Sequence, residues 1–423
     1  MQELINRISK YNLWDNKKIN NGYLRKLYLD RISQYMGNKL IKVIVGQRRV
    51  GKSYILRQIM SNLISEHNVN PKNIFYLNKE YLAFDSIKTS EDLAKVFEFY
   101  ESTIGKPGKK YIFIDEIQDI EEWERFINSY SQDFIGDYEL FISGSNSNLL
   151  SGELSSLLSG RYVEFEILPF DLYEFTDLKK IKVNKASFIK YLQSSGLPEL
   201  FNLTTKESKR NYVFALKNTI ILRDIIYRFN IKDPGLLEEL FNFIVSNIGN
   251  LTSIPSIIKY YKNKQKRTNY DTISNYLNHL KSSFIIHEVE RYNIKGKQNL
   301  GGEKKYYIND LGFKNYLHGI FPDDIGNTLE NYVFTQLKRK GYEVKVGIWG
   351  KSEVDFIATL NEKTIYFQVA YLLKEQQTID REFGNLLKIN DNLEKVVVTL
   401  DDIQFSDYKG IKHIKPWEID SIL

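Results

Sequence analysis

The chain has 423 residues, a formal net charge of +6 and no cysteine. Its length predicts several domains, and its 42% hydrophobic and 26% charged residues are typical of a globular chain rather than a disordered one. The absence of cysteine excludes disulfides and thiolate-bound zinc, and no apolar run approaches the ~20 residues that cross a bilayer. We therefore expect a cytoplasmic protein with no membrane contact.

The segment KLIKVIVGQRRVGKSYILRQIM, residues 39–60, combines an apolar strand, a glycine-containing loop and an amphipathic helix. Within it, Gly46 to Ser53 matches G-x-x-x-x-G-K-[ST] in the strand–loop–helix context of a P-loop. Glycines let backbone amides surround phosphates at the positive end of the helix. The predicted nucleotide contacts are Gly46, Gln47, Arg48, Arg49, Val50, Gly51, Lys52, Ser53 and Tyr54.

The chemistry of this loop predicts ATP and Mg²⁺ as cofactors. Lys52 is expected to reach the β and γ phosphates, and the Ser53 hydroxyl to bind Mg²⁺. A second strand-like segment, YIFIDE at residues 111–116, ends in two carboxylates. Asp115 is expected beside the P-loop in a parallel sheet, where it would hold Mg²⁺.

Glu116 is the candidate for polarising the attacking water, because an Asp-Glu pair favours hydrolysis over transfer to a metabolite. The alternative is that the pair caps the helix that follows, at residues 120–126. The strand at residues 138–146 ends in Ser145 and Asn146, where a γ-phosphate-sensing side chain would lie. Arg161 precedes another strand and would stabilise transition-state charge in cis or from a neighbouring subunit, or else form a structural ion pair.

The segments GQRRVGKS, YIFIDEIQ, LFISGSNSNLLSGR and ILPFDLYEF resemble motifs of the bacterial and archaeal AAA+ superfamily ATPases that carry a C-terminal nuclease-like domain. This resemblance implies an α/β fold with a parallel sheet, a central P-loop strand and a helical lid. We expect the ATPase core at residues 1–170 and the lid at 171–235. The roles of Ser145, Asn146 and Arg161 depend partly on this resemblance.

Residues 257–310 contain 11 Lys/Arg and 5 Asp/Glu, which accounts for the whole net charge. Residues 236–318 follow the order helix, helix, hairpin, which predicts a winged helix-turn-helix that binds double-stranded DNA. The predicted contacts are Ser274, Asn275, Asn278 and Lys281 on the second helix, and Lys295 and Lys297, with Lys304 and Lys305, in the wing. A protein-binding winged helix or a solvated lysine-rich surface is the alternative.

The predicted α-β-β-β-α-β order of residues 319–423 resembles the PD-(D/E)XK nuclease core. Glu330 and Asp355 stand at carboxylate positions, and Glu353 shares a strand face with Asp355. Gln368 and Ala370 replace the second carboxylate and the lysine, which removes an anionic ligand and the cation. We therefore predict a nuclease-derived frame without nuclease activity.

These features predict an ATP-hydrolysing AAA+ ATPase coupled to DNA binding. The alternatives are a nucleotide-controlled protein-interaction switch and an active ATP-dependent nuclease. Action of Arg161 in trans would require a homo-oligomer.

Overall fold

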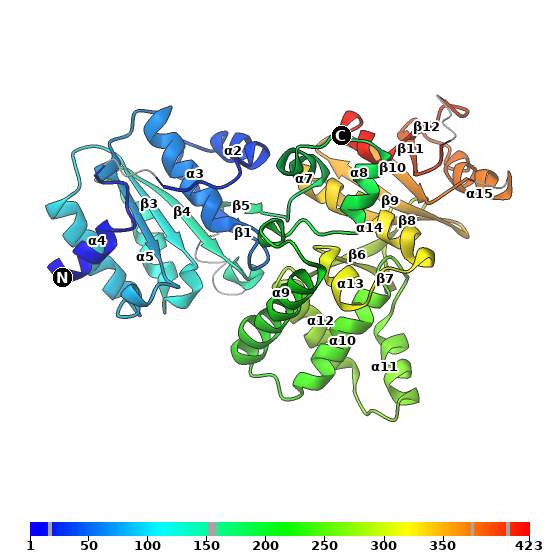
Figure 1. Cartoon of the computed structure of the whole chain (residues 1–423), viewed down its shortest axis with the longest axis horizontal. Coiled ribbons are helices and arrows are strands. Elements are labelled where there is room, and N and C mark those ends of the chain that lie inside the picture. Colours follow the sequence, from blue (N-terminus) through cyan, green and yellow to red (C-terminus); the bar gives the residue numbers. More distant parts are fainter. Residues whose placement is uncertain (16–18, 151–157, 159, 374–375, 403–406) are drawn as a thin grey trace. The chain divides into compact units, whose positions relative to one another are not determined.

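The computed structural model describes residues 1–15, 19–150, 158, 160–373, 376–402 and 407–423. The chain divides into two compact units, Met1–Ile167 and Leu168–Leu423, which are described separately (Figure 1). No helix in the described ranges has both the length and the apolar character needed to cross a membrane.

The first unit is built on a five-stranded parallel sheet with the order β2-β3-β4-β1-β5. Its strands are β1 Ile41–Val45, β2 Ile74–Asn78, β3 Lys110–Asp115, β4 Tyr138–Gly144 and β5 Tyr162–Glu166. Every residue of β1 is buried, as expected for a strand covered on both faces. The resemblance implied a central P-loop strand, whereas β1 lies off-centre, with β4 between it and β3.

Helices cover both faces of this sheet (Figure 1). They are α1 Gln2–Ser9, α2 Lys26–Ser33, α3 Lys52–Ser65, α4 Ser90–Thr103 and α5 Trp123–Gln132. Consecutive residues of β2 face opposite helical layers. Tyr76 packs in the core with α3, whereas the Phe75 ring contacts Phe97 of α4. This period of two places one buried side chain on each face in turn.

The second unit is built on a seven-stranded sheet with the order β12-β11-β10-β9-β8-β6-β7. Its strands are β6 Ile286–Asn293, β7 Gln298–Ile308, β8 Glu343–Trp349, β9 Ser352–Leu360, β10 Lys363–Ala370, β11 Glu394–Thr399 and β12 Lys412–Ile414. Its helices are α7 Leu172–Lys179, α8 Lys185–Leu192, α9 Lys206–Thr219, the π-helix Ile220–Tyr227, α10 Pro234–Ser246, α11 Ile254–Asn263, α12 Tyr270–Ser282, α13 Gly312–Leu317, α14 Ile325–Lys340 and α15 Gln376–Leu387.

The β6–β7 hairpin is continuous with the strands that follow it. β6 pairs in parallel with β8, from Arg291↔Val346 to Asn293↔Ile348, and one core cluster extends from Leu172 to Ile419. The larger core cluster thus contains residues of the predicted lid, winged helix and nuclease-like region, and the division into these three domains stays a prediction. Pairing of β6 with β8 also gives hydrogen-bond partners to backbone groups of β6 that a separate wing would leave at an open sheet edge.

The two faces of this sheet carry different helices. Leu329 and Val333 of α14 belong to the larger core cluster with Phe367, whereas Phe383 of α15 belongs to a second cluster with Tyr366. We call these the α14 face and the α15 face. The element orders α11-α12-β6-β7 and α14-β8-β9-β10-α15-β11 are those predicted, but the winged-helix and nuclease-like assignments stay predictions.

Asp310, just after β7, fastens the loop that follows α8 to the sheet. Its carboxylate accepts hydrogen bonds from Ser195 Oγ at 2.5 Å and from the backbone nitrogens of Gly196 and Gly312, each at 2.7 Å. Asp310→Asn should lower the free energy of unfolding by about 1–3 kcal/mol, because an amide nitrogen would then face a backbone N–H donor. Denaturant unfolding measures this. The control is Ser194→Ala, in which the half-buried Ser194 loses only its hydrogen bond to the Lys190 carbonyl oxygen; equal stability of both variants would contradict the prediction.

Candidate nucleotide site

The loop between β1 and α3 has the backbone that phosphate binding requires. Gly46 and Gly51 have φ angles of +140° and +104°, values that favour glycine. A Cβ atom at Gly46 would lie 2.4 Å from the carbonyl oxygen of Ile167, so the position excludes a side chain. Gly51 is the N-cap of α3, and the free amides of the first helical turn therefore follow the loop directly.

Lys52 is held over this loop. Its Nζ donates hydrogen bonds to the carbonyl oxygens of Gly46 at 3.0 Å and Gln47 at 3.3 Å. The same atom lies 3.5 Å from the carboxylate of Glu116. Only 4% of Lys52 is exposed, so its charge acts in a site of low dielectric constant.

Asp115 is fully buried at the end of β3. Its Oδ2 accepts hydrogen bonds from Tyr76 OH at 3.0 Å and Asn78 Nδ2 at 2.9 Å, and its Oδ1 accepts one from the Ser143 hydroxyl. Burial, then the neighbouring Glu116 charge, raises the pKa of Asp115, and hydrogen bonds from Ser143 and Ser53 lower it in part.

Two partners of Asp115, Asn78 and Ser143, were not among the residues predicted for this site. Asn78 pairs directly with Asp115 in the β2–β3 register, and Ser143 is the next-to-last residue of β4. Both are polar residues near the carboxyl ends of apolar strand segments. That position was the available signal, because the carboxyl ends of parallel strands meet at one edge of the sheet.

Glu116 lies beside Lys52 in a constrained conformation, with a left-handed φ of +55°. Its carboxylate accepts a hydrogen bond from Gln118 Nε2 at 2.6 Å. Burial alone would raise the pKa of Glu116, but Lys52 and the hydrogen bond from Gln118, aided by Arg48 and Ser145, lower it below its usual value. Glu116 is therefore ionised at neutral pH, as a group that orients or deprotonates water must be.

The alternative role of the Asp-Glu pair as a helix cap is not observed. Glu116 precedes the short 3₁₀ helix Ile117–Asp119 without a side-chain capping bond. The helix α5 begins only at Trp123, and its N-cap is Glu122.

The remaining predicted nucleotide contacts surround this centre. Gln47, Val50, Ser145 and Asn146 are buried. Arg48 forms an ion pair with Glu80 at 2.6 Å. Arg49 and Tyr54 are exposed at the rim, and Tyr54 packs against the guanidinium of Arg57.

Arg161 lies at the other edge of the sheet. β5 pairs in parallel with β1 from Tyr162↔Ile41 onwards, so Arg161 stands beside the beginning of β1 whereas the P-loop follows its end. The two ends of β1 are separated by about 13 Å along the strand. The Arg161 guanidinium donates to Asn128 Oδ1 at 2.9 Å. A role in cis therefore does not fit this position, and a role in trans stays a prediction.

The predicted DNA contacts do not form one continuous basic surface. Asn275 and Asn278 are exposed on α12, and Ser274 is half-buried. Lys281 forms an ion pair with Glu288 at 3.0 Å, and Lys304 pairs with the same carboxylate at 2.7 Å. Lys295 and Lys297 in the β6–β7 turn are exposed, and no acidic side chain in the described ranges pairs with them.

Lys305 does not contact solvent as a wing lysine would. It lies in β7 directly after Lys304, so strand alternation turns it to the α14 face. Its Nζ lies 2.8 Å from Glu330, 2.8 Å from Glu353 and 3.4 Å from Asp355. The cation missing from position 370 is thus supplied by another strand.

Two further features define this carboxylate cluster. Tyr307 OH donates to Glu330 at 2.5 Å. Burial, then the Glu330 charge, raises the pKa of Asp355 to about 8, although Lys305 and the amide of Val369 partly oppose that shift. Within the described ranges, no group of three or more acidic or histidine side chains is arranged to hold a metal ion.

Gln368 was predicted beside Asp355, but no described contact joins it to the cluster. Phe367 and Val369 pack on the α14 face, whereas Tyr366 and Ala370 belong to the core of the α15 face. Alternation along β10 therefore directs Gln368 to the α15 face. A shared site of Gln368 and Asp355 stays a prediction.

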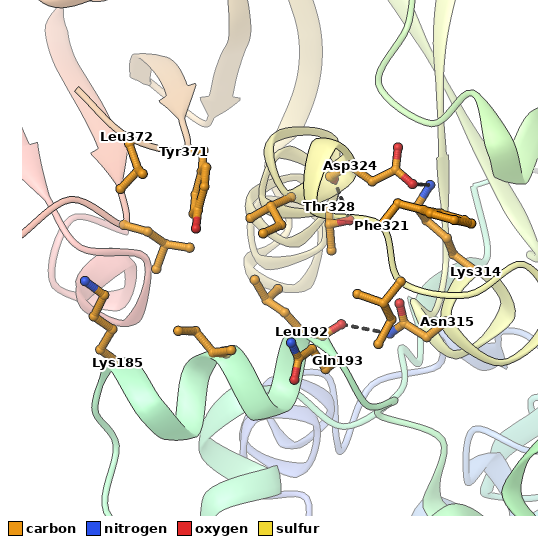
Figure 2. A pocket seen from close by; sticks show the side chains of 14 residues that line it. Lys185, Leu192, Gln193, Lys314, Asn315, Phe321, Asp324, Thr328, Tyr371 and Leu372 are labelled. Carbon is orange, nitrogen blue, oxygen red and sulfur yellow. Dashed lines mark hydrogen bonds and ion pairs between the residues drawn. The ribbon is translucent and has the colours of Figure 1, made fainter. Parts of the chain in front are cut away.

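The second unit also contains an apolar pocket of about 260 Å³ (Figure 2). Four segments distant in sequence line it: α8, the stretch from α13 to α14, the residues after β10, and Leu400 after β11. Leu192, Phe321 and Tyr371 face its interior, and Phe321 is 56% exposed. Its lysines are already paired: Lys185 with Asp402 and Lys314 with Asp324.

Comparison with known proteins places the chain in a family. Residues 38–176 match the family model of an AAA domain, and residues 185–324 match a domain of unknown function (DUF8612). An uncharacterized protein of Haemophilus influenzae is 34% identical over 394 residues, which cover 92% of this chain and 96% of that protein. The chain belongs to the family of that protein. An uncharacterized protein of Methanocaldococcus jannaschii is 28% identical over 382 residues, or 87% of this chain and 82% of its own.

Solved structures of other ATPases are more distant. The Walker-type ATPase PABY2304 of Pyrococcus abyssi is 17% identical, with a TM-score of 0.41 over 69% of this chain and 95% of its own. The ORC1 protein of Aeropyrum pernix, solved in complex with DNA, is 13% identical, with a TM-score of 0.31 over 69% and 91%. Likeness at this level carries no functional argument. The AAA match and the parallel α/β sheet identify the first unit as a P-loop ATPase domain of the AAA type.

Proposed function

We propose that the protein hydrolyses ATP and that hydrolysis is coupled to binding of double-stranded DNA. The observation that carries the proposal is the convergence of Lys52, Asp115 and Glu116 at one edge of the first sheet. A phosphate-binding cation, a metal-binding carboxylate and an ionised base are the groups that nucleotide hydrolysis requires.

The donor set fits Mg²⁺, which prefers one or two protein oxygens together with phosphate oxygens and water. Ser53 and Asp115 are joined by a hydrogen bond and would hold the ion, which would neutralise charge on the phosphates. Lys52 would bind the β and γ phosphates. Glu116 would orient the attacking water and accept its proton, and Ser145 lies beside it to contact the γ-phosphate.

Duplex DNA would bind through the exposed residues Asn275 and Asn278 of α12 and the turn lysines Lys295 and Lys297. Lys295→Glu/Lys297→Glu should weaken duplex binding and make its salt dependence shallower, because each lysine–phosphate contact contributes about −0.9 to the slope of log K against log[salt]. Titration by fluorescence anisotropy at several salt concentrations measures both quantities. Duplex affinity indifferent to salt and to charge reversal would exclude this interface.

ATP turnover with and without duplex DNA tests the coupling. Stimulation by duplex supports the proposal, and turnover that duplex leaves unchanged contradicts it. The structure gives less support to a nuclease, because Lys305 already neutralises the carboxylates that a metal ion would need.

A second candidate function is a nucleotide-controlled switch that binds protein. The apolar pocket beside Phe321 favours it, because its paired lysines leave no free charge for a nucleic acid while its walls would bury an apolar side chain of a partner. If duplex DNA neither binds the protein nor changes its ATP turnover, this second candidate becomes the better-supported function.

A further inference from the structure

We infer that the α15 face of the second sheet carries a groove that binds single-stranded nucleic acid, and this inference rests on the proposed DNA-binding function. The groove has a volume of about 630 Å³ and crosses β6, β8, β9 and β10. Its size lies in the range of pockets for molecules such as nucleotides. It is a different surface from α12, which packs into the core cluster of the α14 face.

Aromatic rings line this groove at intervals across the sheet. Tyr292 comes from β6, Trp349 from the end of β8 and Tyr366 from β10. Tyr292 and Trp349 are only partly buried, so their rings present accessible surface. Unstacked bases bind such rings, whereas the bases of a duplex are already stacked on one another.

Lysines alternate with these rings. Lys295 and Lys297 occupy the β6–β7 turn at the groove, which is held by the hydrogen bond from Gly296 N to Asn293 Oδ1 at 2.8 Å. Lys345 of β8 lies 5.2 Å from the centroid of the Tyr292 ring. In a single-stranded nucleic acid the phosphates and the bases point in different directions, so ammonium groups can bind the phosphates while neighbouring aromatic rings stack on the bases.

The acidic side chains in the groove do not oppose an anion. Glu343 pairs with Lys345 at 2.9 Å. Asp391 accepts a hydrogen bond from Tyr366 OH at 2.9 Å and pairs with Lys395 at 3.2 Å. Both carboxylates are thus compensated, while Lys295 and Lys297 keep their charge for phosphates. Base stacking on aromatic rings and lysine–phosphate contacts do not depend on base identity, so binding should tolerate any sequence.

The test measures binding of fluorescein-labelled dT15, a 15-base-pair duplex and U15 RNA to the full-length protein by anisotropy. Trp349→Leu should weaken dT15 binding about five- to hundredfold, because it removes one base–aromatic stack, and should leave duplex binding unchanged. Trp349→Phe should retain most of the affinity. Quenching of tryptophan fluorescence by unlabelled dT15 should be smaller in Trp349→Leu than in the wild type.

Lys295→Glu/Lys297→Glu should weaken dT15 binding, whereas Lys259→Glu/Lys262→Glu, which reverses two exposed charges on α11, should not. Equal affinity of Trp349→Leu and the wild type for dT15 would overturn the groove. Binding of duplex without binding of dT15 would also overturn it and would leave the proposed function intact. Binding of neither DNA would reject the proposed function itself. Comparable binding of U15 would support a site for single strands of either sugar.

Discussion

Glu116→Gln should retain ATP but lower the turnover number by about 10²–10⁴-fold, the usual contribution of a positioned general base. The amide keeps the size of the side chain and can still accept the hydrogen bond from Gln118. It cannot carry the charge that Lys52 stabilises or accept a proton from water. Phosphate release at saturating ATP measures turnover, and a fluorescent ATP analogue measures binding.

Glu122→Gln is a matched control for this substitution. Glu122 has a left-handed φ of +53°, close to that of Glu116, but it is exposed on the far side of the short 3₁₀ helix. Its substitution should leave turnover unchanged. Lys52→Ala should lose nucleotide binding itself, which separates the two roles. Equal turnover in Glu116→Gln and the wild type would show that another group positions the water.

The nucleotide site was largely predictable because its parts are local in sequence. The P-loop occupies eight consecutive residues, and Asp115 and Glu116 end one apolar strand. Asn78 and Ser143 were missed because their contacts with Asp115 depend on strand order, which the sequence does not display. Arg161 precedes its strand, and parallel strands begin at the edge away from the P-loop, so its position conflicts with a role in cis and leaves the role in trans a prediction.

The second unit was less predictable because its interactions join distant segments. The order of its elements follows from local patterns, whereas the pairing of β6 with β8 and the core cluster that joins Leu172 to Ile419 do not. Ala370 stands where the nuclease pattern has a lysine, and the ammonium group beside the carboxylates comes instead from Lys305, 65 positions earlier in the sequence. Only the register of β7 against its neighbours turns Lys305, rather than Lys304, towards Glu330 and Asp355.

Lys305→Met should lower the free energy of unfolding by roughly 3–5 kcal/mol, the usual cost of removing one partner from a buried ion pair. The carboxylates of Glu330 and Glu353 would lose their shared cation, and Asp355, which its raised pKa keeps mostly protonated at neutral pH, would lose the positive charge beside it. Lys304→Met is the matched control. Lys304 precedes Lys305 in β7, and its ammonium group pairs with Glu288 nearer the surface, so this pair should contribute at most about 1 kcal/mol to stability. Urea unfolding of both variants measures the difference.

The pH dependence of unfolding separates lost charge pairing from lost packing. The native pKa of Asp355 is about 8, above the 3.8 usual for an aspartate, so its contribution to stability is fully present below about pH 4 and is lost as pH rises through 8. Lys305 lowers that pKa, so Lys305→Met should raise it further, and the loss of stability, which levels off above about pH 8 in the wild type, should continue to higher pH. Lys304→Met should follow the wild-type curve. A Lys305→Met curve parallel to the wild type would mean that the lysine acts through its hydrocarbon stem alone, and that the carboxylates do not depend on its charge.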